Sequence, residues 1–218
     1  MWGKWLCFCL DNRLPDYGFS NNRKPLRSAR WLSAFLASDM SDEGGHHELI
    51  ELFRRVWKPA VAGSTCVSAS TALRAWLDWS QARAVGWWHR HDDVLRMIGF
   101  EASIDMPIDV QVAFADAMRE VSLDRIELGC VRAAAEMRPV VAREDAANWG
   151  LGGSATWLQR FAAQQSLAIP IVQDSTVVGV LAIATAEPFE ESSATWKMLA
   201  ELVTELGGNA SRGSDSPT

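Results

Sequence analysis

The sequence predicts an α+β fold built around a central antiparallel sheet. Residues 167–188 give the clearest signal, because two runs of β-branched and other apolar residues flank the polar tripeptide 173–175, as in a β-hairpin. A second hairpin is expected over residues 82–102, with its turn at 90–93. Helical segments separate the two hairpins, and the strand-helix-strand alternation typical of a parallel sheet is missing from the sequence. The strands are therefore expected to pair antiparallel.

The N-terminal part of the sequence has no structural period. Residues 1–39 mix Trp, Cys, Arg, Asn and Pro without helical or strand spacing, and we expect a poorly ordered extension over residues 1–45. Met40 precedes the polar run Ser-Asp-Glu-Gly-Gly and is a candidate start of translation. The apolar run after Met1 is too short for a signal peptide, and no stretch approaches the ~20 apolar residues of a membrane span.

From His46 the apolar residues follow a helical period. Leu49, Phe53 and Trp57 lie on one face of a predicted helix over 46–57, which Pro59 should end. A second helix is predicted over 71–79, with Ser68 or Ser70 as its N-cap. The strands of the first hairpin are then expected at 82–89 and 94–102.

The remaining elements alternate between helices and short strands. Phe114 and Met118 share the apolar face of a predicted helix over 110–121, and a shorter helix should follow at 126–137. A small strand is expected at 139–142, and a helix over 155–165 should turn Trp157 and Phe161 inward. After the second hairpin, a last amphipathic helix is predicted over 190–206. One domain over 46–206 and a disordered tail over 207–218 complete the expected organisation.

Composition excludes several classes of partner. The formal net charge is −6 and the pI is about 5.2, whereas a nucleic-acid surface needs clustered Lys and Arg. The four cysteines are too few and too scattered for a disulfide scaffold, which favours a reducing, cytoplasmic location. We therefore expect neither a nucleic acid nor a membrane as partner.

Three blocks of sequence resemble a known family. In residues 128–142 a Gly opens a short helix of small residues that leads to a basic residue, Pro and a β-branched pair. The second block is 166–171 followed by 177–181, and the third is the closing helix that begins near Phe189 and Glu190. With these blocks in this order, residues 46–206 resemble a GAF domain, a family of sensory and regulatory domains.

The resemblance implies a fold, a function and a site. The fold would be a single GAF-like, PAS-related domain with helices on both faces of the sheet. The chain would be a stand-alone cytoplasmic domain in signal transduction, binding a small molecule in an apolar, Trp-lined pocket, and forming a homodimer through the helices at 46–57 and 190–206. No cofactor is identified. The predicted ligand-binding side chains are Trp88, Met97, Phe114, Cys130, Trp149 and Trp157.

This sequence lacks the motifs of several GAF subfamilies, which limits the kind of ligand that the resemblance implies. The Asn-Lys-Phe-Asp-Glu set of cyclic-nucleotide binders is missing, and Cys130 is followed by Val131 where bilin attachment uses a neighbouring His. One alternative is a redox enzyme of the free methionine sulfoxide reductase type that uses Cys130 and Cys66. Another is a pure dimerisation module. An enzyme is the less favoured interpretation, because no His neighbours Cys130 in sequence.

Two further motifs have a functional and an ordinary interpretation. His89 and His91 would point the same way on a strand, as a metal pair requires, with Asp92 and Asp93 beside them; solvated turn residues are the ordinary explanation. The Gly-rich loop 150–153 lacks the Lys and Ser or Thr of a phosphate-binding loop. We interpret it, with Trp149, as a flexible lid.

Overall fold

The computed structural model describes residues 43–61, 66–188 and 190–208. The extension expected over 1–45 lies almost entirely outside the described residues, as does the tail from 209. The elements in order are α2 (Glu43–Val61), α3 (Cys66–Ser80), β1 (Ala84–His91), β2 (Val94–Ala102), α4 (Ile108–Met118), β3 (Glu120–Ser122), α5 (Gly129–Glu136), β4 (Val140–Arg143), the 3-10 helix η1 (Ala146–Trp149), α6 (Gly152–Phe161), β5 (Gln165–Gln173), β6 (Thr176–Thr185) and α7 (Ala194–Gly208). The expected domain boundaries, 46 and 206, stay predictions.

The strands form one six-stranded sheet in the order β3-β2-β1-β6-β5-β4. Every strand pair is antiparallel, which confirms the predicted α+β fold. The two hairpins, β1-β2 and β5-β6, meet at the centre, where β1 pairs with β6 and Trp87 lies opposite Leu181. The hairpin β5-β6 turns through Asp174 and Ser175, which both have positive φ (48° and 61°), as a two-residue turn of matching twist requires.

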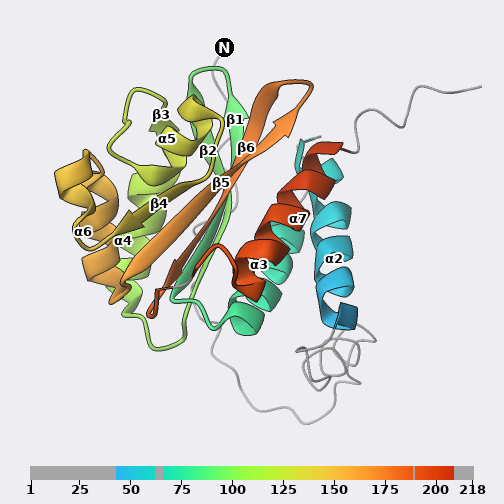
Figure 1. Ribbon diagram of the computed structural model, residues 1–218, viewed down its shortest axis with the longest axis horizontal. Helices are drawn as coiled ribbons and strands as arrows, with labels where there is room; N and C mark the ends of the chain where they lie inside the picture. The colour runs from blue at the N-terminus through green and yellow to red at the C-terminus, as the bar shows by residue number, and fades with distance from the viewer. Residues whose placement is uncertain (1–42, 62–65, 189, 209–218) are drawn as a thin grey trace, which may run out of the picture. The chain divides into compact units, whose positions relative to one another are not determined.

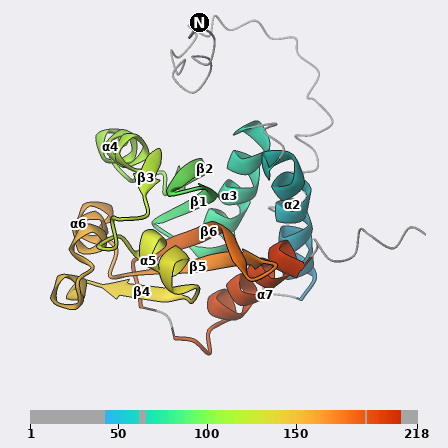
Figure 2. The same ribbon diagram turned by 90° about the horizontal axis from the view of Figure 1, so that it is seen from above.

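Helices cover both faces of the sheet, as Figures 1 and 2 show: α2, α3 and α7 lie on one face, and α4, α5 and α6 on the other. Trp87 and Trp88 pack on opposite faces of the sheet, because successive strand residues point in opposite directions. The Trp87 ring stacks on Trp57 of α2 at 5.4 Å, whereas the Trp88 ring meets Phe114 of α4 at 6.4 Å. None of the described helices is both long enough and apolar enough to span a membrane.

Several predicted boundaries were wrong, and tertiary contacts explain the largest error. The helix expected to reach Val121 ends at Met118, and Val121 lies in β3, a strand that was not predicted. Three residues cannot show a period, and β3 exists because it pairs with Val94–Arg96 of β2. The helix expected from 155 begins at Gly152, and it ends where Ala162 adopts a left-handed conformation with φ 51°.

The helices before the sheet are longer than expected. α2 continues past Pro59 to Val61, because a proline so close to a helix end removes only one hydrogen bond. α3 begins at Cys66, so Ser68 and Ser70 lie inside the helix and are not its N-cap. The Ser70 hydroxyl instead donates to the Glu101 carboxylate on β2. These longer helices extend the cover on one face of the sheet.

Candidate ligand-binding site

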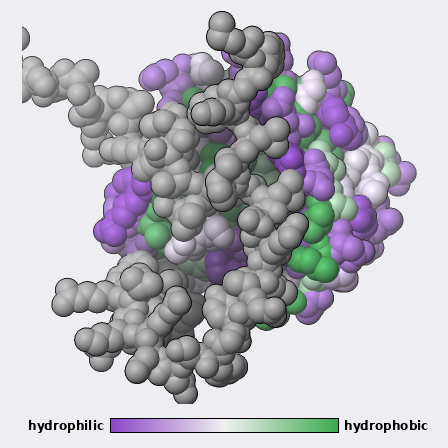
Figure 3. Space-filling view, turned by 180° about the vertical axis from the view of Figure 1, so that it is seen from behind, coloured by the Kyte–Doolittle hydropathy of each residue, from purple (hydrophilic) through white to green (hydrophobic). Residues whose placement is uncertain are grey.

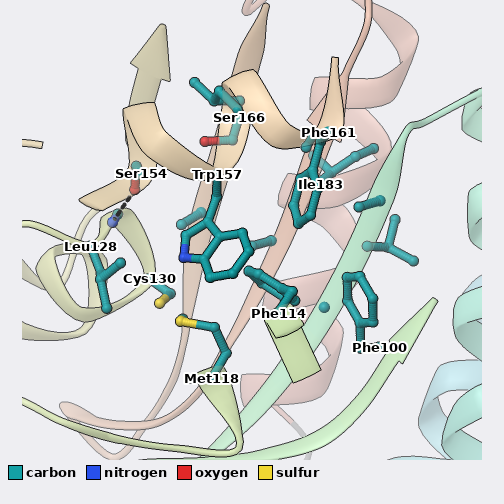
Figure 4. Close-up of a pocket in the computed structure, with 18 of the residues that line it drawn as sticks. Phe100, Phe114, Met118, Leu128, Cys130, Ser154, Trp157, Phe161, Ser166 and Ile183 are labelled. Atoms are coloured by element: carbon teal, nitrogen blue, oxygen red, sulfur yellow. Dashed lines mark hydrogen bonds between the residues drawn. The ribbon is translucent and has the colours of Figure 1, made fainter. Parts of the chain in front are cut away.

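A cavity of about 70 Å³ lies between the sheet and the helices α4, α5 and α6 (Figure 4). Its floor is formed by β1, β5 and β6, and its cover by side chains of the three helices, with Phe100 of β2 at one side. The lining residues are Ala84, Val85, Gly86, Trp88, Phe100, Phe114, Met118, Leu128, Gly129, Cys130, Ser154, Trp157, Leu158, Phe161, Ser166, Ala168, Ala182, Ile183 and Ala184.

Small residues on the floor leave the space that the aromatic residues surround. Ala84, Ala168 and Ala182 present only methyl groups, so the sheet does not fill the volume below the helices. Gly86 is needed for another reason: a Cβ there would lie 2.3 Å from the Trp88 ring, which therefore lies across Gly86. Glycine at this position lets Trp88 form part of the wall.

The cover is an aromatic cluster set by helical spacing. Phe114 and Met118 are one turn apart on α4, and Trp157 and Phe161 are one turn apart on α6, so each pair faces the sheet together. The centre of the Phe114 ring lies 5.0 Å from the ring centre of Trp157, 4.9 Å from that of Phe161 and 4.6 Å from that of Phe100. Edge-on and tilted contacts of this kind hold the rings in place at the mouth of the cavity.

Two hydrogen bonds hold the walls. The Trp88 indole N–H donates to the Met118 carbonyl oxygen at 3.0 Å, which ties β1 to the end of α4. The Gly129 backbone N–H donates to the Ser154 hydroxyl oxygen at 2.7 Å, which joins the first turns of α5 and α6 (Figure 4). The Arg160 guanidinium lies 4.5 Å from the centre of the Trp157 ring.

The structure brings four of the six predicted residues to this cavity: Trp88, Phe114, Cys130 and Trp157. Met97 packs against the same core from β2 but does not line the cavity. Trp149 is 72% exposed at the end of η1 and lines a separate hollow with Glu190 and Trp196. Whether any of the six contacts a ligand stays a prediction.

Arg132 of α5 explains the position of Trp149. Its guanidinium donates to the carbonyl oxygens of Trp149 at 2.9 Å, Gly150 at 2.7 Å and Ile126 at 3.1 Å. These bonds hold the loop backbone against α5 while the indole points outward. The loop therefore does not cover the cavity in this structure.

Sequence reasoning missed several lining side chains. Met118 and Phe161 could have been found, since each lies one turn from a predicted site residue. Phe100 lies on β2, which reaches the cavity only at its side. Ser154 and Ser166 have no distinguishing pattern in the sequence, because small polar residues are common at helix starts and strand ends.

The helices that carry the two cysteines of the predicted redox alternative, α3 and α5, lie on opposite faces of the sheet. Cys130 is buried, and burial raises the pKa of its thiol to about 12, so the thiol stays protonated at neutral pH. The helix α3, which begins at Cys66, packs on the opposite face of the sheet from α5. Cys130 therefore behaves as a small apolar lining residue.

His89 and His91 do meet, as the motif predicted. The Nδ1 atom of His89 lies 3.0 Å from the Nε2 atom of His91, and the His89 ring lies edge-on to Trp57 at 5.8 Å. Burial and the neighbouring His91 lower the pKa of His89. Among the described residues no group of three or more metal-ligating side chains comes together, with Asp92 and Asp93 exposed at the turn.

The unobscured part of the face in Figure 3 is mostly hydrophilic, with small hydrophobic areas between the polar ones. Ile108 and Val112 are exposed one turn apart on α4, and Ile104 is exposed just before that helix. The aromatic cavity is therefore the strongest candidate for a binding site in the described part of the chain.

Comparison with known proteins supports a family and a fold. The family model of the GAF domain matches residues 109–209. No curated protein matches this sequence. Three solved structures share the fold at a TM-score of 0.51. A GAF domain of A. Aeolicus in an inactive state is 15% identical, with 73% of this chain and 93% of that chain covered.

The other two structures hold small molecules. Free methionine-R-sulfoxide reductase from Neisseria meningitidis, in complex with its substrate, is 17% identical over 77% of this chain and 90% of that chain. The phycoerythrobilin-bound GAF domain of a cyanobacterial phytochrome is 10% identical over 74% of this chain and 91% of that chain. Residues 109–209 thus match the GAF domain family, and the described part of the chain shares the antiparallel fold of solved GAF domains.

Proposed function

We propose that this chain is a cytoplasmic sensory domain in signal transduction that binds a small molecule in the cavity under α4, α5 and α6. The observation that carries the proposal is the aromatic cavity itself, which four of the six predicted side chains line. The similar structures that hold phycoerythrobilin and a reductase substrate support a small molecule as occupant of this fold. The cytoplasmic location rests on the cysteine content alone.

Native mass spectrometry of the full chain, purified from its own host, tests the proposal. We expect a bound small molecule on the wild-type chain. Ala182→Leu should remove it, because Ala182 lies on the cavity floor and is only half-buried, so the added methyl groups fill free space. The matched control is Ala135→Leu, at an exposed position of α5 that does not line the cavity. A molecule retained by Ala182→Leu, or none on the wild-type chain, would contradict the proposal.

We also propose that two copies associate through the outer faces of α2 and α7. The helices lie side by side on one face of the sheet (Figures 1 and 2), joined by a 2.6 Å ion pair between Arg54 and Glu205. Leu52 and Val203 are partly exposed apolar side chains on these helices. Leu52→Glu and Val203→Glu should shift the mass in light scattering from two copies to one. Thr156→Glu, on the other face of the sheet, should not.

Cys130 does not favour the alternative of a methionine sulfoxide reductase. A buried thiol with a pKa of about 12 is a poor nucleophile, and α3 with Cys66 lies across the sheet. The proposed role is therefore binding and regulation.

A further inference from the structure

We infer that the ligand is an uncharged, mainly apolar molecule with one oxygen acceptor, held by a hydrogen bond from the Ser154 hydroxyl. This inference rests on the proposed function, because it names the class of ligand for the same cavity. Three features support the inference. The described lining contains no charged side chain, the basic side chains nearby are already paired, and the Ser154 hydroxyl still has a hydrogen to donate.

None of the described residues that line the cavity is Asp, Glu, Lys, Arg or His. A carboxylate that entered would lose its hydration and find no opposite charge beside it, and an ammonium group would regain only part of its lost hydration from the aromatic faces. The aromatic rings and alanine methyl groups offer dispersion contacts, which an uncharged molecule gains without that loss. The lining therefore favours uncharged ligands over charged ligands of the same size.

The basic side chains near the cavity already have partners. Arg83 binds the Asp105 carboxylate at 2.7 Å and the Phe161 carbonyl oxygen at 3.0 Å. Arg125 is paired with Glu127 at 2.8 Å.

Two further arginines near the cavity are held as well. Arg132 donates to three backbone carbonyl groups, and Arg160 lies over the Trp157 ring. None of these four arginines lines the cavity, so an anionic ligand would have to displace an existing interaction to reach a positive charge.

Ser154 and Ser166 are the two hydroxyl side chains in the described lining, and Ser154 is the one that joins two helices of the cover. Its oxygen accepts the Gly129 N–H at 2.7 Å, and a hydroxyl that accepts one hydrogen bond still has its own hydrogen to donate. No acceptor for that hydrogen is found among the described residues. A Cβ at Gly129 would lie 3.3 Å from the Ser154 oxygen, so glycine keeps this corner open. A carbonyl or ether oxygen on the ligand fits the unused donor.

The size of the cavity sets the scale of the ligand. The cavity volume counts the space open to the centre of a water-sized sphere, and one water molecule needs about 10–15 Å³ of it. The cavity provides about 70 Å³, which is room for several non-hydrogen atoms. The flexible Met118 side chain in the cover is the part best able to move for a larger ring. Butanone is small enough for the cavity as it stands. Acetophenone is larger, and its binding tests whether Met118 moves to make room.

The experiment compares three molecules of similar size on the full chain at pH 7.5: uncharged acetophenone, anionic benzoate and cationic benzylammonium. Butanone and propionate form a smaller pair. Dissociation constants come from ligand-observed NMR, with the shift in Tm as a second readout. We expect the charged members to bind at least about tenfold more weakly than the uncharged ones. Ala182→Leu should abolish binding of acetophenone, and the exposed-site control Ala135→Leu should not.

Ser154→Ala tests the hydrogen bond. Its affinity for acetophenone should fall by roughly 3- to 10-fold, whereas toluene, which has no acceptor, should bind as it does to the wild-type chain. Equal losses for both molecules, or none for acetophenone, would remove Ser154 from the inference. Thr156→Ala, on the exposed side of the same helix, is the matched control.

The outcomes separate this inference from the proposed function. Benzoate or benzylammonium bound as tightly as acetophenone, and lost in Ala182→Leu, would overturn the charge selection while leaving the cavity as the ligand site. Binding of no probe to the wild-type chain would count against both.

Discussion

The Ser154 hydroxyl oxygen accepts a hydrogen bond from the Gly129 amide at 2.7 Å, across 25 residues of sequence. It satisfies a first-turn N–H of α5, whose preceding residue, Leu128, provides no side-chain cap. One side chain of α6 thus completes the N-terminus of α5, and the same oxygen lies at the cavity.

Replacing Ser154 by alanine should lower the free energy of unfolding by about 1 kcal/mol, because the buried Gly129 amide loses its acceptor. Urea unfolding measures the change. Thr156→Ala is the control, since the exposed Thr156 hydroxyl bonds only within its own helix, to Gly152. Equal effects of the two substitutions would show that the bond between α5 and α6 adds no stability.

Trp88 and Trp87 offer a comparison of two buried indoles. The Trp88 N–H donates to the Met118 carbonyl oxygen, whereas the Trp87 N–H is buried without an acceptor among the described residues. Both Trp→Phe changes remove similar apolar area, but only Trp88→Phe leaves an acceptor unpaired. We expect it to cost about 1–2 kcal/mol more than Trp87→Phe in chemical unfolding. A larger loss for Trp87→Phe would contradict this assignment of the hydrogen bonds.

Gly86 and Gly152 differ in the space around them. A Cβ at Gly86 would meet the Trp88 ring, and the hydrogen bond of that ring limits its movement, so Gly86→Ala should destabilise the fold by roughly 1–3 kcal/mol. Nothing lies within 4 Å of the Cβ position at Gly152 in α6. Gly152→Ala should therefore be neutral or stabilise by up to about 1 kcal/mol, because alanine favours helix. Thermal unfolding of both variants provides the test.

His89 predicts a pH dependence. Burial and the nearby His91 lower its pKa in the folded chain from 6.5, so the unfolded chain binds more protons below that pH. Its contribution to stability is complete above pH 6.5 and is lost as pH falls through the lower folded value. His89→Gln should flatten the decrease in the free energy of unfolding just below pH 6.5, measured by urea titrations at several pH values.

Two comparisons make the pH test specific. Thr156→Gln, an exposed change that removes no titratable group, should leave the decrease unchanged. Asp105 acts in a separate window: hydrogen bonds from Arg83 and Ser103 lower its pKa from 3.8 to about 2, so its contribution is lost only in stronger acid. If the free energy of unfolding of wild type and of His89→Gln changed in parallel between pH 5 and pH 7, the prediction for His89 would be disproved.

The sequence by itself determined the two hairpins, the helices and the antiparallel sheet. Alternating apolar residues around Asp174 and Ser175, and the helical spacing of Phe114 with Met118, depend only on local geometry. The same rules placed Trp88, Phe114 and Trp157 in segments that do meet at the cavity.

Only the tertiary structure decided which of these side chains share a site. β3 forms because β2 lies beside it, and Trp149 points outward because Arg132, 17 residues away, binds its backbone. The bond between Ser154 and Gly129 likewise depends on how α6 packs on α5. Such contacts join residues far apart in the chain, and no periodic pattern records them, so the chemistry of the cavity became visible only in the folded protein.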